Sequence, residues 1–167
     1  MTIEEAIKTA IEFETRIRDI YQEATAAVED EVGKRIFETL CKDEQHHIDY
    51  LRDKLMQWQA TGKIVPERLD SIVPSQEIVN REAEKVKSLV AKDFLGIRRQ
   101  MLSKALSTEI ETSDFYQKMV NELPAEGRAL FERFLEIENS HIKTVQFELD
   151  YLSKTGYWFD IKEFDME

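Results

Sequence analysis

The two halves of the sequence repeat each other, and this repeat limits the possible folds more than any other feature. Residues 33–47 and 127–141 align without a gap and share a glycine, a basic residue, an aliphatic residue, Phe-Glu and a final Glu-x-x-His. A Thr-Gly pair begins 14 residues after each final histidine, at 61–62 and 155–156. A repeat of this kind indicates that one structural unit occurs twice in the chain.

The repeat extends upstream, where Glu14 and Tyr21 match Glu109 and Tyr116, each pair seven residues apart. Apolar residues recur at heptad-like spacing through both halves, as on the buried face of a helix. Residues 2–5 carry a capping-box pattern, and the Thr-Gly pairs are typical helix-stopping signals. These patterns therefore predict a helical hairpin in each half of the chain.

We expect one all-α domain over residues 1–167, built as a four-helix bundle of two duplicated helical hairpins joined by a long crossover. The predicted parts are a hairpin at 2–62, a crossover with a short helix at 63–93, a hairpin at 94–156 and an acidic aromatic tail at 157–167. The predicted boundaries inside these parts are a first turn near Glu29 and Asp30, a short helix from a Ser75 cap through about Lys92, a third helix from Phe94 to Leu123 and a fourth from Ala125 to Thr155.

Composition narrows the class of protein. The net charge of −11 argues against nucleic acid or an anionic membrane as a partner. The start of the chain has no signal-peptide pattern, and no apolar run approaches the ~20 residues that span a bilayer. Cys41 is the single cysteine, which excludes an internal disulfide and a multi-cysteine metal site within one chain. These features predict a cytoplasmic protein.

Six polar residues interrupt the apolar stripes of the predicted helices. They are Glu14, Glu44, His47, Glu109, Glu138 and His141. Each shares a helix face with apolar neighbours three or four positions away, so each is expected to point into the core. The midpoint of each glutamate pair, 14 with 44 and 109 with 138, falls at a predicted turn, so the hairpins bring all six to one level.

Four carboxylates and two imidazoles at one level of a core need compensation, because a buried unpaired charge is costly. Two divalent cations supply four positive charges. Oxygen and imidazole ligands without thiolate suit iron or manganese, and zinc can also occupy such a site. A single Glu-x-x-His is most often a solvated helix face, whereas two copies at matching positions predict a di-metal centre.

These six residues resemble the ligand pattern of ferritin-like di-iron carboxylate proteins, and over about residues 2–156 the chain looks most like the rubrerythrin type without its rubredoxin domain. The resemblance implies a ferritin-like bundle that binds two iron ions. It implies that Glu44 and Glu138 bridge the irons, that Glu14 and Glu109 are terminal ligands, and that His47 and His141 each bind one iron. Tyr21 and Tyr116 match positions where these proteins place a tyrosine near the ligands, with ordinary core packing as the alternative.

The chain departs from the rubrerythrin pattern in two ways. Thr112 stands where rubrerythrins carry an extra glutamate, and Glu111 should point elsewhere. Without a rubredoxin domain, electrons must come from an external donor such as a rubredoxin-like protein. Gln45 stands where bacterioferritin carries its haem-binding methionine, so no haem is expected.

The predicted function is a homodimeric di-iron oxidoreductase that reduces hydrogen peroxide or oxygen. Two alternatives remain open at this point. The first is a ferroxidase or iron-storage protein that uses the same site, and the second is a helical interaction module with a relic site.

Overall fold

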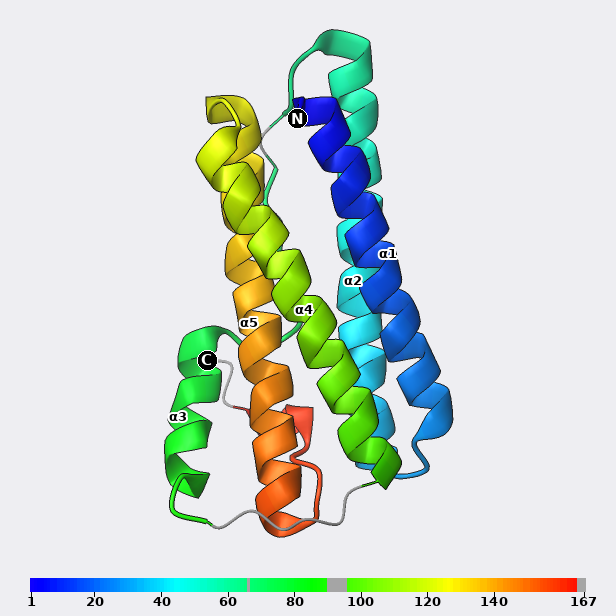
Figure 1. Ribbon diagram of the computed structural model, residues 1–167, viewed down its shortest axis with the longest axis vertical. Coiled ribbons are helices and arrows are strands. Elements are labelled where there is room, and N and C mark those ends of the chain that lie inside the picture. Colours follow the sequence, from blue (N-terminus) through cyan, green and yellow to red (C-terminus); the bar gives the residue numbers. More distant parts are fainter. Residues whose placement is uncertain (66, 90–95, 165–167) are drawn as a thin grey trace.

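The computed structural model describes residues 1–65, 67–89 and 96–164, and the described chain is entirely helical apart from turns and connections. Four long helices lie side by side and a shorter one packs against the outside of the last of them (Figure 1). The helices are α1 (Ile3–Ala27), α2 (Glu31–Thr61), α3 (Gln76–Val86), α4 (Gly96–Glu122) and α5 (Ala125–Thr155), followed by a 3-10 turn, η1 (Ile161–Glu163). The all-α bundle predicted from the sequence is confirmed at this level.

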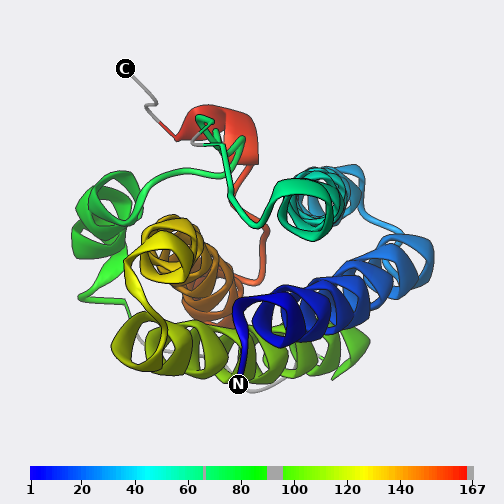
Figure 2. The same cartoon turned by 90° about the horizontal axis from the view of Figure 1, so that it is seen from above.

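The long helices form two antiparallel pairs, α1 with α2 and α4 with α5. The pairs meet mainly where α1 packs against α4, while α2 and α5 stand further apart (Figure 2). In Figure 1 α2 ends at the top and α4 begins at the bottom, so these two helices run in the same direction. The described part of the connection, residues 62–75 apart from residue 66, lies on the side where α2 faces α5.

The helix ends follow the local sequence signals. The predicted capping box is confirmed, since the Glu5 amide donates to Thr2 Oγ1 at 3.1 Å and the Thr2 amide donates to Glu5 Oε2 at 2.8 Å. Gly62 and Gly156 end α2 and α5 in the left-handed conformation, with φ of 69° and 80°. Only glycine adopts this conformation without steric cost. The Thr-Gly stop signals are therefore confirmed in both halves.

One predicted boundary differs from the structure. The predicted Ser75 cap is confirmed, but α3 ends at Val86 and not near Lys92, because its apolar face, which packs on α5, ends there. Helix α1 ends at Ala27 and α2 begins at Glu31, so the predicted turn near Glu29 and Asp30 is confirmed. Helix α4 begins at Gly96, and the predicted start at Phe94 lies outside the described residues.

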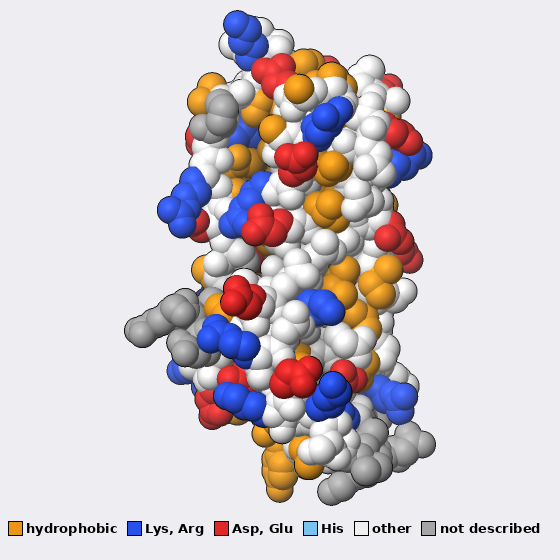
Figure 3. All heavy atoms as spheres, turned by 90° about the vertical axis from the view of Figure 1, so that its left-hand side faces the viewer, with side chains coloured by type: hydrophobic (Ala, Val, Ile, Leu, Met, Phe, Trp, Pro, Cys, Tyr) orange, Lys and Arg blue, Asp and Glu red, His pale blue; other side chains and the backbone are white. Residues whose placement is uncertain are grey.

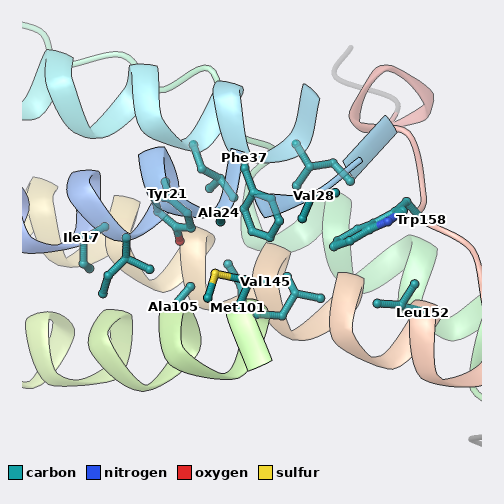
Figure 4. Close-up of a cluster of buried hydrophobic side chains, with 14 of the residues drawn as sticks. Ile17, Tyr21, Ala24, Val28, Phe37, Met101, Ala105, Val145, Leu152 and Trp158 are labelled. Atoms are coloured by element: carbon teal, nitrogen blue, oxygen red, sulfur yellow. The ribbon is translucent and has the colours of Figure 1, made fainter. Parts of the chain in front are cut away.

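The core consists of two large apolar clusters at different heights of the bundle. One cluster combines the first turns of α1, the end of α4 and the first half of α5. The other combines the second half of α1 with the starts of α2 and α4 and the distal half of α5. The second cluster includes Trp158 of the tail, which packs against Phe37 with ring centroids 5.5 Å apart (Figure 4). The tail thus covers the bundle's own core, as expected from its aromatic residues.

Two glycines of the repeat occupy the same position in their helices. Gly33 and Gly127 are each the third residue of their helix, α2 and α5. A Cβ at Gly33 would lie 2.8 Å from the Trp158 ring, and one at Gly127 would lie 3.0 Å from Ile3. Both positions exclude a larger side chain because another segment packs closely there.

The surface that carries α3 and α5 shows acidic and basic side chains interspersed with apolar ones (Figure 3). Within the described chain, none of the helices is both long and apolar enough to cross a lipid bilayer. The structure thus offers no transmembrane helix among these residues.

Candidate metal centre

The six residues predicted as metal ligands lie together in the middle of the bundle, between the two apolar clusters. All six side chains are fully buried. The four long helices contribute Glu14 (α1), Glu44 and His47 (α2), Glu109 (α4), and Glu138 and His141 (α5). A buried layer of four carboxyls and two imidazoles is costly unless each group finds a partner.

The ligand atoms form two overlapping groups, in each of which one atom per residue lies within 4.8 Å of the others. The groups are Glu14, Glu44, His47 and Glu138, and Glu44, Glu109, Glu138 and His141. Glu44 and Glu138 belong to both groups. Each group also has one further glutamate and one histidine that the other group lacks. Sharing of carboxylates between adjacent cations is typical of two-metal sites.

Both histidines turn the same ring nitrogen toward the carboxylates. His47 Nδ1 lies 3.2 Å from Glu44 Oε2 and 3.4 Å from Glu14 Oε2. His141 Nδ1 lies 2.6 Å from Glu44 Oε1 and 3.4 Å from Glu109 Oε1. The two imidazole rings stack with centroids 5.4 Å apart. Nδ1 is therefore the nitrogen positioned to bind a metal, and Nε2 faces away.

Asp43 is a member of this site that the sequence reasoning missed. It is fully buried, and its Oδ2 lies 2.8 Å from Nε2 of His141 and 3.5 Å from Nε2 of His47. The same carboxylate accepts from Ser71 Oγ at 2.6 Å and from the Ile72 amide at 3.1 Å. A carboxylate behind a histidine fixes the ring orientation and the tautomer. Here one carboxylate faces both rings and also anchors the connection.

The two tyrosines predicted to lie near the ligands reach across the bundle. The Tyr21 hydroxyl, from α1, donates to Glu109 on α4, and the Tyr116 hydroxyl, from α4, donates to Glu14 on α1. Burial and the nearby carboxylates raise the pKa of both phenols well above the usual value. Both tyrosines therefore keep their protons. Each donates a hydrogen bond to a glutamate that belongs to one ligand group alone, Tyr21 to Glu109 and Tyr116 to Glu14.

The buried carboxyls and imidazoles of the site shift each other's pKa. Burial and the charges of neighbouring carboxylates raise the pKa of Glu44 and Glu138 well above the usual range. Burial lowers the pKa of His47 and His141, but the surrounding carboxylates outweigh it and raise the pKa of both. At Glu14 burial raises the pKa, yet hydrogen bonds with Glu44 and His47 bring it down to about 2.

These shifts favour the protonated forms of Glu44, Glu138 and both imidazoles over the charged carboxylates, which repel one another. Divalent cations can replace such protons as partners of the carboxylates, because metal ligands bind in their deprotonated forms. The exchange also removes the mutual repulsion of the carboxylates, because each becomes a ligand.

Several buried polar atoms of the site have no hydrogen-bond partner among the described residues. The atoms on the metal side are Glu44 Oε1, Glu109 Oε2, both carboxyl oxygens of Glu138, and His141 Nδ1. His47 Nε2 also lacks a partner among the described residues, but it lies on the far side of its ring and faces Asp43. Glu44 Oε1 and His141 Nδ1 are only 2.6 Å apart, yet their geometry is not that of a hydrogen bond. Unsatisfied ligand atoms that converge in this way fit a bound cation, and the donor set of carboxylates and imidazoles suits iron, manganese or zinc.

The residues that mark the departures from the rubrerythrin pattern are also located by the structure. Thr112 is buried and its hydroxyl donates to the Thr108 carbonyl at 2.8 Å, so no further carboxylate occupies that position on α4. Glu111 points away from the site and pairs with Arg16 at 3.5 Å on the surface. Cys41 is half-buried, and burial raises the pKa of its thiol.

Comparison of the chain with models of known protein families finds no match, and comparison with curated proteins finds none either. The functional assignment therefore depends on the geometry and chemistry of the buried Glu, Asp and His group, which can hold a metal ion.

Proposed function

We propose that this protein is a ferritin-like, rubrerythrin-type di-iron oxidoreductase that reduces hydrogen peroxide or dioxygen with electrons from an external donor. The observation that carries the proposal is the pair of overlapping buried groups, each with one histidine, one glutamate of its own and the two shared carboxylates of Glu44 and Glu138. Nitrogen and oxygen ligands without thiolate favour iron or manganese over softer metals.

The proposal includes the origin and assembly of the bundle. We take the α1–α2 and α4–α5 pairs as duplicated hairpins joined by a long crossover. The equal length of α2 and α5, 31 residues each, and their matching glycine ends support this view. The same proposal includes that the protein is a homodimer in solution and that a rubredoxin-like protein delivers the electrons.

Each residue of the candidate metal centre has a role in the proposed chemistry. When bound, the iron pair supplies the electrons and a Lewis acid for the reduction. Glu44 and Glu138 would contribute to holding both ions, Glu14 and His47 would complete one set of ligands, and Glu109 and His141 would complete the other. Asp43 accepts from Nε2 of His141 and also faces Nε2 of His47 at 3.5 Å, which keeps Nδ1 of both rings toward the centre.

The tyrosines and the apolar clusters complete the environment. Tyr21 and Tyr116 hold a proton at the hydroxyl oxygen, each directed at one glutamate. The clusters above and below exclude bulk water, which strengthens every charge interaction within the site.

Iron handling, as a ferroxidase or storage protein, is the second candidate. Thr112 leaves the site with six ligands and no additional carboxylate on α4. A six-ligand centre serves iron oxidation as well as peroxide reduction, so the two candidates differ in the fate of the iron and not in the ligands.

The experiment that tests the proposal is anaerobic loading with Fe(II), followed by stopped-flow mixing with hydrogen peroxide and with dioxygen in separate runs. We expect two Fe(II) per chain to be oxidised faster than free Fe(II), and to be reduced again by an external donor without leaving the protein. Iron that accumulates as a ferric deposit would support iron handling. Oxidation no faster than that of free Fe(II) would exclude both.

A further inference from the structure

A small cavity lies between α2 and α5, on the side of the bundle where these helices stand apart. Its volume is about 170 Å³, and its walls are mostly apolar, with Ile64, Leu69, Ala129, Leu130 and Phe134 among them. Charged groups of Glu67, Glu126 and Arg133 also belong to its lining. Glu67, Glu126 and Val65 are exposed, so the cavity is open to solvent on that side.

The cavity is separated from the candidate metal centre by one aromatic ring. Phe134, which forms part of its wall, meets the ring of His47 edge-on with centroids 5.5 Å apart. The same phenyl ring lies 5.4 Å from the ring of Tyr116. Phe134 therefore touches both a predicted ligand and the tyrosine that donates to Glu14.

The described residues of the connection that border the cavity are fixed by side chains of α2 and α5. The Tyr50 hydroxyl donates to the Glu67 carbonyl at 2.8 Å, and Lys54 Nζ donates to the Val65 carbonyl at 2.9 Å. From the other side, Arg133 Nε donates to the Leu69 carbonyl at 2.9 Å. Tyr50, Lys54 and Arg133 thus hold the connection in place over the buried apolar floor of the cavity.

We propose that this cavity is the binding site of a small apolar molecule next to the metal centre, and that dioxygen is the molecule it takes. The choice of dioxygen rests on the proposed function. The six ligands are fully buried, so an oxidant must pass through the protein to reach them. The floor of the cavity is formed by the buried side chains of Leu69, Leu130 and Phe134, which offer a small apolar molecule close van der Waals contacts.

The lining distinguishes dioxygen from hydrogen peroxide. Peroxide gives up several hydrogen bonds to water when it enters an apolar space, and this desolvation is unfavourable. Dioxygen has no such cost. The cavity therefore favours dioxygen as the oxidant that approaches past Phe134, whereas peroxide needs a more polar route.

The binding test uses the protein as purified, with dissolved dioxygen as a paramagnetic probe in methyl NMR. We expect the methyl groups of Leu69 and Leu130 to relax severalfold faster with dioxygen than those of Leu40 and Val145, which are equally buried but belong to the other apolar cluster. Xenon should shift the same two leucines. Equal relaxation of all four residues would overturn the proposal, whatever the metal content.

A pair of variants tests whether the cavity serves the centre. Ala129→Phe adds a ring at the cavity wall, and Ala60→Phe adds the same ring at an exposed position of α2 that does not line it. In Fe(II)-loaded protein, Ala129→Phe should slow oxidation by dioxygen severalfold and leave oxidation by peroxide nearly unchanged, while Ala60→Phe changes neither. Equal slowing of both oxidants by Ala129→Phe would contradict a dioxygen site.

The two tests separate the failure of this inference from the failure of the proposed function. If iron is not oxidised at all but Leu69 and Leu130 respond to dioxygen and xenon, the cavity stands and the proposed function falls. If iron is oxidised by dioxygen while neither leucine responds, the proposed function stands and the cavity is not the binding site.

Discussion

Helix α5 buries two glutamates in different surroundings. Glu138 and Glu148 are ten residues apart, which is about 15 Å along a helix, and both are almost completely shielded from solvent. Glu138 lies among three other carboxyls and two imidazoles. Glu148 lies near the tail residues Phe159 and Asp160, and its carboxyl oxygens have no hydrogen-bond partner among the described residues.

Both carboxyls have a raised pKa, but the two environments can stabilise them in different ways. Around Glu138 burial acts together with the charges of Glu14, Glu44 and Glu109, so a cation in their midst relieves several groups at once. At Glu148 burial dominates, the Phe159 amide partly offsets it, and Asp160 adds to it. A lone buried carboxyl is most simply stabilised by retaining its proton. The comparison indicates that grouping of acids, more than their burial, marks the metal site.

Removal of metal should have the largest effect on this comparison. Each cation bound at about a hundredfold excess over its Kd adds ~2.7 kcal/mol, so two sites add about 5 kcal/mol. For a chain of this size this corresponds to a Tm difference of roughly 10–20 °C. Melting curves of protein with excess Mn(II) or Fe(II), against protein treated with chelator, measure it. Identical melting temperatures would mean that the buried layer is not a metal centre.

Substituting Glu138 and Glu148 in turn should affect metal binding very differently. Glu138→Gln removes a carboxylate shared by both groups, so binding should fall by more than ~100-fold at one position or both, by analogy with loss of a direct ligand. Glu148→Gln should leave two metals per chain. Metal analysis after dialysis and titration with Co(II) measure the stoichiometry. Loss of metal in Glu148→Gln, or none in Glu138→Gln, would reverse the comparison.

The stability of the protein should depend on pH through Glu148. The pKa of this carboxyl is raised from 4.5, so between pH 4.5 and the higher folded value the native state keeps a proton that the unfolded state has released. In that window each pH unit lowers the free energy of unfolding by about 1.4 kcal/mol, and below it the effect disappears.

Glu148→Gln cannot lose this proton and should gain stability over the wild type as pH rises from 5 to 8. Urea unfolding of both proteins with the same metal in excess measures the difference. Working with metal bound keeps the other buried acids as ligands throughout. A difference that stays constant with pH would show that Glu148 is ionised in the folded protein.

Loss of Asp43 should weaken the metal centre without removing a ligand. Asp43→Asn keeps the size of the side chain but replaces the carboxylate that both imidazoles face, and comparable changes lower metal affinity by ~10–100-fold. Ser71→Ala removes only the hydroxyl that donates to this carboxylate, so its effect should be smaller. Competition with a metal indicator measures both. Equal affinity in Asp43→Asn and wild type would assign Asp43 to the connection alone.

The repeat explains which parts of the site could be predicted from the sequence. The six ligands were identifiable because each interrupts an apolar stripe and each has a counterpart in the other half. Asp43 was missed because its counterpart is Ile137, although its position four residues before His47 places both on one helix face. A search for repeated residues finds those that occur in both halves. It misses a residue such as Asp43, which occurs in one half but faces histidines of both.

The same logic could not assign Lys54 and Glu148, which occupy equivalent positions of the repeat with opposite charge. Both are buried. Lys54 reaches the Val65 carbonyl and lies 3.0 Å from Glu67 Oε1, whereas Glu148 has no comparable partner among the described residues. The difference arises because separate segments cover the two positions, the connection in one half and the tail in the other. Contacts between segments far apart in the chain are not visible in helical periodicity.

The smallest expected effect comes from moving the tail without touching either glutamate. In Gly33→Ala the new Cβ would lie 2.8 Å from the rings of Trp158 and from Val28, so the tail must shift at a cost of about 1–3 kcal/mol. Gly127→Ala, the matched position in α5, meets Ile3 and Leu123 at 3.0 and 3.1 Å and does not touch the tail.

Fluorescence in a Trp58→Phe background reports Trp158 alone, since the chain has two tryptophans. A red shift is expected for Gly33→Ala only. Because the shifted tail lets water approach Glu148, this variant should also show a weaker decline of stability with pH, while both variants still bind two metals. Gly33→Ala could expose Trp158 and leave the pH dependence of stability unchanged. That outcome would show that cover by the tail does not raise the pKa of Glu148. The difference between Glu148 and Glu138 would then depend on the helices around them alone.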